Sequence, residues 1–144
     1  MGVADAIRAR RVPTAHPFPT CFVCGPERAD GLRLFAGPVP GTEIVAASWI
    51  PDADLAGPDG HVYPEFVWAA LDCPGAFAVV DLGRQPVVLG RLEGRQVTPV
   101  TARHTYVVLG WPLGRDGRKL FAGTAICGRN GELIAAARAS WFAV

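Results

Sequence analysis

The reactive side chain that stands out in this sequence is Asp72, a carboxylate in the middle of an apolar stretch. The stretch runs from Val62 to Gly83 and reads VYPEFVWAALDCPGAFAVVDLG. Its apolar residues cover every face of a helix, which is typical of a helix enclosed by protein. A buried carboxylate costs free energy unless it is paired or used, and a partly desolvated one can take a proton from water. Asp72 is therefore either a general base or a polar contact across a subunit interface.

The ends of this stretch predict one continuous helix of about eighteen residues, roughly 27 Å long. Pro64 suits the first turn, where its missing N–H costs nothing, and Gly83 is a typical C-terminal stop. Glu65 in the first turn is a second candidate for a catalytic acid, although the helix dipole alone favours a carboxylate there. Pro74 predicts a bend beside Asp72, because it cannot donate a hydrogen bond to the Ala70 carbonyl.

The bulk composition limits the classes of function. The chain has 144 residues, half of them hydrophobic, and a formal net charge of +1. This charge gives no electrostatic basis for binding nucleic acid or a membrane surface. The apolar run from Phe66 to Val80 is too short for a transmembrane span and is interrupted, and the chain opens with no secretory leader. We therefore expect a cytoplasmic protein, in which the four cysteines are free thiols.

The rest of the chain predicts an antiparallel sheet around this helix. We expect an N-terminal arm over residues 1–20, including a short helix at most, and a single domain over residues 21–144. The turn signals include Asn130-Gly131, which is the strongest two-residue hairpin signal. Nothing else in the chain can cover so apolar a helix, so the sheet must wrap it, and the fold class is α+β. The predicted strands are Gly31–Gly37, Glu43–Ile50, Pro86–Val97, Thr101–Trp111, Lys119–Gly128 and Glu132–Val144.

Two motifs resemble the hotdog-fold thioesterase superfamily, in which a curved antiparallel sheet wraps a long central helix. Cys21-Phe-Val-Cys24-Gly25, followed by Gly31-Leu-Arg-Leu34, resembles the opening of many hotdog proteins. The segment Ala69-Ala-Leu-Asp72 resembles that of phenylacetyl-CoA-type thioesterases, whose aspartate is the catalytic carboxylate. The resemblance implies an acyl-CoA or acyl-carrier thioesterase in which Asp72 activates water. It also implies an active site at a homodimer interface, alone or within a tetramer, and no cofactor beyond the coenzyme A of the substrate.

One departure from that family concerns the start of the helix. Such thioesterases carry His-Gly-Gly there, and a backbone N–H of the motif polarises the thioester carbonyl. The corresponding triplet here is Tyr63-Pro64-Glu65, and Pro64 has no N–H to donate. An oxyanion donor must then come from Glu65, Phe66 or another segment. The expected substrate-binding residues are His61, Tyr63, Phe66, Trp68 and Ala69, with Phe77 also beside the acyl group.

The cysteines and arginines allow further interpretations. Cys21 and Cys24 have the spacing of metal ligands, but no second such pair exists. We therefore predict a structural turn and no metal, with a zinc site and a redox pair as the two alternatives. Cys73 is interpreted as a small buried hydrophobic residue. The arginines could form a surface cradle for the phosphates of coenzyme A, and the candidates are Arg84, Arg91, Arg95, Arg103, Arg115 and Arg118.

Two other functions remain open from the sequence. A hotdog hydratase or dehydratase would need a histidine beside Asp72, and His104 or His61 could supply it. A structural, hydrogen-bonded role is the simpler interpretation of His104, and His16 in the arm is interpreted as solvent-exposed. A non-catalytic protein that binds an acyl group or another small ligand is favoured by Pro64 at the expected oxyanion position.

Overall fold

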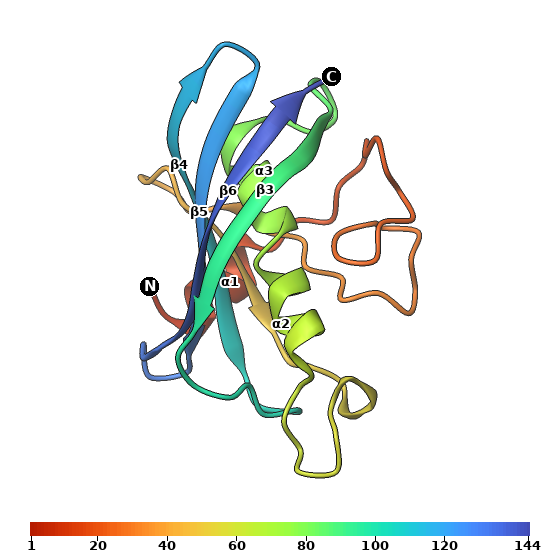
Figure 1. Ribbon diagram of the computed structural model, residues 1–144, viewed down its shortest axis with the longest axis vertical. Coiled ribbons are helices and arrows are strands. Elements are labelled where there is room, and N and C mark those ends of the chain that lie inside the picture. Colours follow the sequence, from red (N-terminus) through yellow and green to blue (C-terminus); the bar gives the residue numbers. More distant parts are fainter.

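In the computed structural model, which describes residues 1–144, six strands form one antiparallel sheet that curves around two consecutive helices (Figure 1). This is the α+β hotdog architecture that the sequence predicts. The strand order is β1-β2-β4-β5-β6-β3, so β3 is one edge of the sheet. The elements are α1 (Val3–Ala9), β1 (Gly37–Pro38), β2 (Val45–Trp49), the 3₁₀ helix η1 (Ala53–Leu55), α2 (Pro64–Ala70), α3 (Cys73–Val79), β3 (Val87–Gln96), β4 (Tyr106–Asp116), β5 (Lys119–Gly128) and β6 (Leu133–Ala143).

The concave face of the sheet accepts the helices because small residues lie at its centre. Ala122 and Ala139 are opposite each other on β5 and β6, and both are fully enclosed by the core that α3 completes. Gly110 on β4 lies against the backbone of Pro74, at the start of α3. These positions let the helix axis approach the strands closely, and the larger apolar side chains fill the space on either side.

The central helix is broken, which corrects the prediction of one continuous helix. Leu71 and Asp72 separate α2 from α3, and the Asp72 backbone lies outside the helical region at φ −81°, ψ −84°. Pro74 cannot donate to the Ala70 carbonyl, and the Gly75 N–H donates to the Asp72 carbonyl at 3.2 Å. The sequence predicts a bend beside Asp72, whereas in the structure one helix ends and another begins there.

The exit of the helix also differs from the prediction. Helix α3 ends at Val79, and Val80 is already extended at φ −145°, ψ 161°. Asp81, Leu82 and Gly83 then form a turn in which the Gly83 N–H donates to the Asp81 carboxylate at 3.1 Å. Gly83 belongs to this turn and is not the residue that stops the helix.

The N-terminal part of the chain wraps the sheet on both sides. Helix α1 packs on the convex face, where Ala6 and Ala9 meet Ala46 of β2 and Val107 of β4. Residues 12–36, which we call the covering segment, then pass to the other side and lie over the helices, at the right of Figure 1. The backbone of Leu32 and Leu34 there donates to the carbonyls of Phe22 and Val23 at 2.7 and 2.9 Å.

Two of the predicted strands have the wrong bounds. Residues 31–36 belong to the covering segment, and only Gly37–Pro38 joins the sheet. Residues 101–105 form a turn with Arg103 at φ 67°, so β4 begins at Tyr106 and continues to Asp116. Strand β5 has the predicted bounds. None of the helices is long and apolar enough to cross a membrane.

Candidate functional site

The break in the central helix places Asp72 at a pocket. Its side chain is half-buried and lines a cavity of about 230 Å³ between the helix, the covering segment and the strand β3. No hydrogen bond to another residue and no ion pair engages the carboxylate. A half-buried carboxylate with free lone pairs beside a cavity can bind water or a substrate group.

Burial is the main cause that shifts the pKa of Asp72. Burial, together with the smaller effect of negative charge on the nearby Cys21 sulfur, raises the pKa from the usual range to about 6. A carboxyl with a pKa near neutrality exchanges protons readily with water at physiological pH. The environment of Asp72 is therefore suited to proton transfer.

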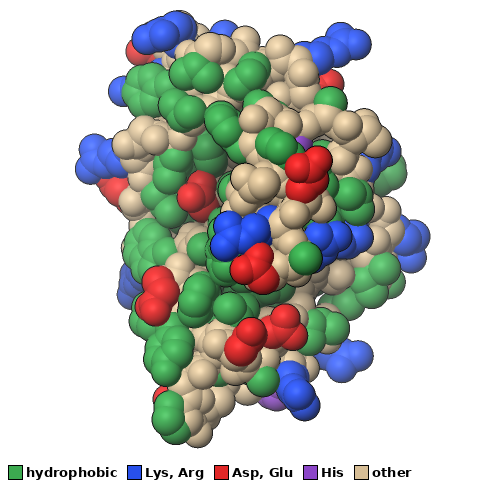
Figure 2. Space-filling model, turned by 90° about the vertical axis from the view of Figure 1, so that its right-hand side faces the viewer, with side chains coloured by type: hydrophobic (Ala, Val, Ile, Leu, Met, Phe, Trp, Pro, Cys, Tyr) green, Lys and Arg blue, Asp and Glu red, His purple; other side chains and the backbone are tan.

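The pocket is otherwise apolar. Ten of the twelve residues that line it are hydrophobic, and the two polar ones are Asp72 and His16. Val88 and Leu89 on the edge strand β3 form one wall, and both are partly exposed to solvent. Such a cavity suits an apolar group whose reactive end lies beside the carboxylate. Figure 2 shows the helix side of the molecule, where hydrophobic side chains gather along the left-hand side among scattered charged groups.

A buried hydroxyl anchors the helix break to the sheet. The Thr124 side chain on β5 is fully buried and donates a hydrogen bond of 2.7 Å to the carbonyl of Leu71. In an unbroken helix that carbonyl would accept from the N–H of Gly75, which bonds to Asp72 here. Thr124 therefore satisfies the acceptor that the break leaves free, and it fixes the residue that precedes Asp72.

Three cysteines and one histidine adjoin the carboxylate. The sulfur atoms of Cys21, Cys24 and Cys73 all lie within 4.8 Å of one another, and those of Cys21 and Cys73 are 3.7 Å apart. His16 lies beside them, with its Nε2 3.1 Å from the Cys24 sulfur. It is half-buried, so its interpretation as solvent-exposed was wrong, because the covering segment folds back over the helix.

The pKa values of the three thiols shift in opposite directions. Hydrogen bonds from the Cys24 and Cys73 thiols, together with the backbone N–H groups of Cys24 and Val23, lower the pKa of Cys21. The thiol hydrogen bonds to Cys21 raise the pKa of Cys24 and of Cys73, and burial adds to both shifts. Burial lowers the pKa of His16, which favours the neutral imidazole. The cluster thus favours a thiolate at Cys21.

Trp141 on β6 adds a polar atom without a partner. Its side chain lines the pocket, and its indole Nε1 is buried with no hydrogen bond. A Cβ atom added at Gly75 would lie 3.1 Å from this nitrogen, so the indole packs directly against α3. The inner wall of the pocket therefore contains a buried donor close to the helix that begins beside Asp72.

Four other predicted site residues lie outside the pocket of Asp72 within one chain, namely His61, Tyr63, Glu65 and Phe66. Glu65 is exposed on the first turn of α2, and His61 and Tyr63 line a separate hollow of about 490 Å³ before that helix. Phe66 is half-buried against Phe22, with the ring centroids 6.0 Å apart. None of these residues lines the pocket of Asp72.

Trp68 and Ala69 lie on the same helix, and both are half-buried. Ala69 packs against the main core, and Trp68 lies beneath β3, where a Cβ atom added at Gly94 would be 2.8 Å from its ring. His104 is exposed in another hollow, about 510 Å³ in volume, with Arg103. The structure thus places neither His104 nor His61 beside Asp72.

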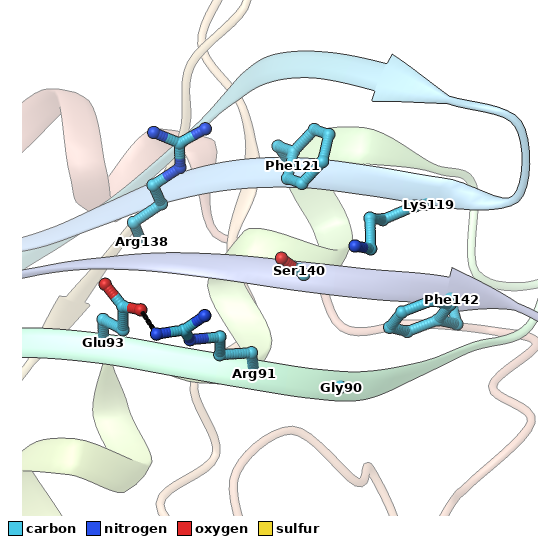
Figure 3. Close-up of a pocket in the computed structure, with 8 residues that line it drawn as sticks. All are labelled: Gly90, Arg91, Glu93, Lys119, Phe121, Arg138, Ser140 and Phe142. Atoms are coloured by element: carbon cyan, nitrogen blue, oxygen red, sulfur yellow. Dashed lines mark ion pairs between the residues drawn. The ribbon is translucent and has the colours of Figure 1, made fainter.

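A hollow of about 380 Å³ on the convex face gathers positive charge (Figure 3). Lys119 and Arg138 both lie over the ring of Phe121, at 5.9 and 5.6 Å from its centroid, and Arg91 pairs with Glu93. Of the arginines predicted to form a cradle, only Arg91 lies here. Glu93 is the only carboxylate that lines this hollow, and Arg91 pairs with it, whereas the Asp72 carboxylate has no partner and adjoins an apolar pocket. Asp72 is therefore the better candidate for catalysis.

Sequence reasoning missed the contributions of Thr124, His16 and Trp141 to this site. Thr124 is separated from Leu71 by 53 positions, and His16 belongs to a segment without periodicity. The only local signal was the Cys21–Cys24 spacing, whose third partner, Cys73, was interpreted by itself. The three segments meet only because the covering segment closes over the helix break.

Comparison with solved structures identifies the fold. A thioesterase superfamily protein, RHA08564, matches with a TM-score of 0.73 and 21% identity over 84% of this chain, which spans 62% of that protein's length. The hypothetical thioesterase protein of Streptococcus pneumoniae TIGR4, in its structure with coenzyme A, matches with a TM-score of 0.64 and 12% identity over 70% of this chain and 78% of that one.

The E. coli PaaI protein, from the phenylacetic acid degradation operon, has a TM-score of 0.64 and 11% identity over 71% of this chain and 73% of that one. The sequence matches no known protein-family model, and no curated protein matches it. These likenesses confirm the hotdog fold of thioesterase superfamily proteins.

Proposed function

We propose that this protein hydrolyses acyl thioesters and that Asp72 activates the attacking water. The observation that carries the proposal is the half-buried, unpartnered carboxylate of Asp72 at the helix break, facing an apolar pocket. The fold shared with thioesterase superfamily proteins supports it, and coenzyme A in the Streptococcus structure supports an acyl-CoA substrate.

The chemistry follows from the side chains at the pocket. The acyl chain occupies the apolar cavity, so that the thioester carbonyl lies near Asp72. Water adds to the carbonyl carbon as one of its protons passes to the Asp72 carboxylate. The carbon–sulfur bond then breaks, the carboxylic acid forms, and the proton goes to the leaving sulfur. These steps use no metal and no bound cofactor.

A homodimer formed through β3 would complete the site. Strand β3 pairs with β6 on one side only, and its ten residues leave an unpaired row of backbone groups at the other edge of the sheet. Val88 and Leu89 on this strand are 42% and 36% exposed and also line the pocket of Asp72. A second copy that pairs with β3 would cover both the edge and the pocket.

The remaining predicted residues fit this dimer. His61, Tyr63 and Glu65 are exposed at the start of α2, so they are available to contact a second copy. We place them against the substrate held in the pocket of the other subunit, with Glu65 as a second acid. Phe66, Trp68 and Ala69 lie deeper along the same helix and would contact the acyl group.

A panel of acyl-CoA substrates with a thiol-trapping reagent tests the function. We expect release of free coenzyme A with at least one substrate, and we expect Asp72→Asn to lower kcat/KM by about 10²–10⁴-fold, as loss of a general base does. The matched control is Asp81→Asn, at an exposed turn carboxylate of the same helical region, which should retain wild-type turnover.

The same panel separates the alternatives. Hydration of an enoyl-CoA without thiol release would indicate a hydratase. Binding of acyl-CoA that stays intact for hours would indicate a ligand-binding protein. Unchanged turnover in Asp72→Asn, with the fold verified by circular dichroism, would remove Asp72 from the mechanism.

A further inference from the structure

The cysteine cluster beside Asp72 contains more than the proposed hydrolysis requires. Cys21 and Cys24 come from the covering segment, and Cys73 is the first residue of α3. All three are free thiols whose sulfur atoms lie within 4.8 Å of one another. The fourth cysteine, Cys127, is in strand β5 and is not part of the cluster.

The sulfur spacing fits a common metal ion better than a disulfide. A disulfide requires about 2.05 Å between its sulfur atoms, whereas those of Cys21 and Cys73 are 3.7 Å apart. Zinc binds thiolates at about 2.3 Å in a tetrahedron, which places neighbouring sulfur atoms about 3.8 Å apart. The observed separation is therefore close to the edge of a zinc–thiolate tetrahedron.

The backbone around Cys21 holds its sulfur and that of Cys24 in one direction. The Cys21 N–H donates to the Phe18 carbonyl at 3.0 Å, and the Gly25 N–H donates to the Cys21 carbonyl at 2.8 Å. The turn is so tight that a Cβ atom added at Gly25 would lie 2.4 Å from the Cys21 nitrogen. The Cys-x-x-Cys-Gly sequence thus forms a tight turn that holds two sulfur atoms close together, and Cys73 provides a third sulfur atom from the helix.

His16 is positioned to donate to this cluster and not to ligate an ion. The backbone N–H of Phe18 donates to Nδ1 of His16 at 2.9 Å, so Nδ1 acts as an acceptor. The proton of the neutral ring then resides on Nε2, which lies 3.1 Å from the Cys24 sulfur. A protonated Nε2 has no lone pair for a metal, but an N–H group there stabilises a sulfur ligand.

We propose that Cys21, Cys24 and Cys73 bind one soft divalent cation, of which zinc is the best match, with the fourth coordination position open to the pocket that Asp72 lines. Soft thiolate ligands select zinc over magnesium or calcium, and three protein ligands leave one position for water or a small ligand. The proposal does not depend on thioester hydrolysis, because metal binding is measured without a substrate.

Metal analysis of the full chain provides the first test. Protein purified under reducing conditions with zinc in the medium should contain about one zinc per chain. After the zinc is removed with a chelator, titration with Co²⁺ should give sulfur-to-cobalt charge-transfer absorption and the visible bands of a tetrahedral site. Addition of zinc should abolish both signals.

Substitutions identify the ligands. Cys21→Ser, Cys24→Ser and Cys73→Ser should each weaken cobalt binding by more than about 100-fold, since loss of an outer-shell partner alone costs 10–100-fold. Cys127→Ser is the matched control and should bind as the wild type does. His16→Ala should weaken binding but retain the sulfur-to-cobalt bands, which separates a positioning residue from a ligand.

Thiol alkylation of the wild type tests the proposal even if the serine variants do not fold. Cys24 and Cys73 are buried, so serine there could disturb the fold. In the zinc-loaded wild type an alkylating reagent should modify Cys127 alone, and chelation should expose Cys21. Reduced wild-type protein that binds neither zinc nor cobalt, or a thiol reactivity that chelation does not change, would overturn the proposal.

Discussion

Thr124 connects the position of the Asp72 carboxylate to the sheet. Its hydroxyl is fully buried, and the Leu71 carbonyl that it satisfies immediately precedes Asp72. A helix break buried in a core needs such a donor, because an unsatisfied carbonyl there loses its hydrogen bond to water without replacement. A single side chain on β5 thus allows the helix to stop where the pocket requires it.

Replacement of Thr124 by valine tests this role. Valine has nearly the same shape but cannot donate, so we expect the free energy of unfolding to fall by about 1–3 kcal/mol. Turnover should fall as well, because Asp72 loses its fixed backbone. Urea denaturation and the acyl-CoA assay measure the two effects.

The control for this substitution is Thr124→Ser, which keeps the hydroxyl and loses only a methyl group. We expect it to retain turnover, with a cost of about 0.5–1.5 kcal/mol for the lost methyl. A Thr124→Val variant as stable and as active as the wild type would show that the hydrogen bond is dispensable.

At the level of elements, the fit of α3 on β4 decides where the helix restarts. Gly110 lies against the backbone of Pro74, and a Cβ atom added there would be 2.5 Å from the Pro74 carbonyl oxygen. Neither a strand backbone nor a helix backbone can move easily to relieve this contact. The absence of a side chain at Gly110 is therefore a condition for the position of α3.

Gly110→Ala should push α3 away from the sheet and lower the free energy of unfolding by about 1–3 kcal/mol, as overpacking does. Thermal denaturation measures the change. The control is Gly2→Ala, because a Cβ atom added there would lie 3.7 Å from the nearest atom, which is an ordinary contact. Its cost should be confined to the N-cap of α1 and stay below about 1 kcal/mol. Equal stability of the two variants would contradict the argument.

These elements also show what the sequence could predict. Alternation and turn signals gave the bounds of β5 correctly, and the apolar stretch with Pro64 correctly predicted where the central helix begins. Pro74 predicted a bend, but the complete break depends on Thr124, which no local pattern connects to Leu71. Residues 31–36 have a strand-like composition, yet they lie within the covering segment, where the backbone of Leu32 and Leu34 bonds to Phe22 and Val23 and not to a strand of the sheet.

The site was predictable only in part for a similar reason. Asp72 was evident because a charge in an apolar helix is unusual. The neighbours of Asp72 come from the covering segment, from β3 and from β6, and their meeting depends on the path of the whole chain. Cys73 had no signal of its own until the structure placed it beside Cys21.

For the whole molecule, the unpaired edge of β3 predicts the mode of association. Val88→Lys would place a charge at this edge, and in a symmetric dimer two such charges would face each other. We expect the dimer dissociation constant to rise by at least about tenfold, which corresponds to 1.4 kcal/mol. Light scattering after size exclusion, at several concentrations, measures it.

The control substitution is Leu113→Lys, on β4 away from this edge, where the native side chain is 49% exposed. It should leave the dissociation constant unchanged. A wild type that stays monomeric at all concentrations, or a Val88→Lys variant that dimerises as tightly as the wild type, would contradict association through β3.

The covering segment has one further consequence. It supplies one wall of the cavity, yet it forms no strand over residues 12–36 and is not part of the sheet that defines the architecture. Substitutions at Phe18 and its neighbours can therefore change the shape of the cavity while the sheet keeps its strand pairing. Differences in substrate preference among chains of this kind should accordingly map to the part that corresponds to residues 12–36 more than to the sheet and the helices beneath it.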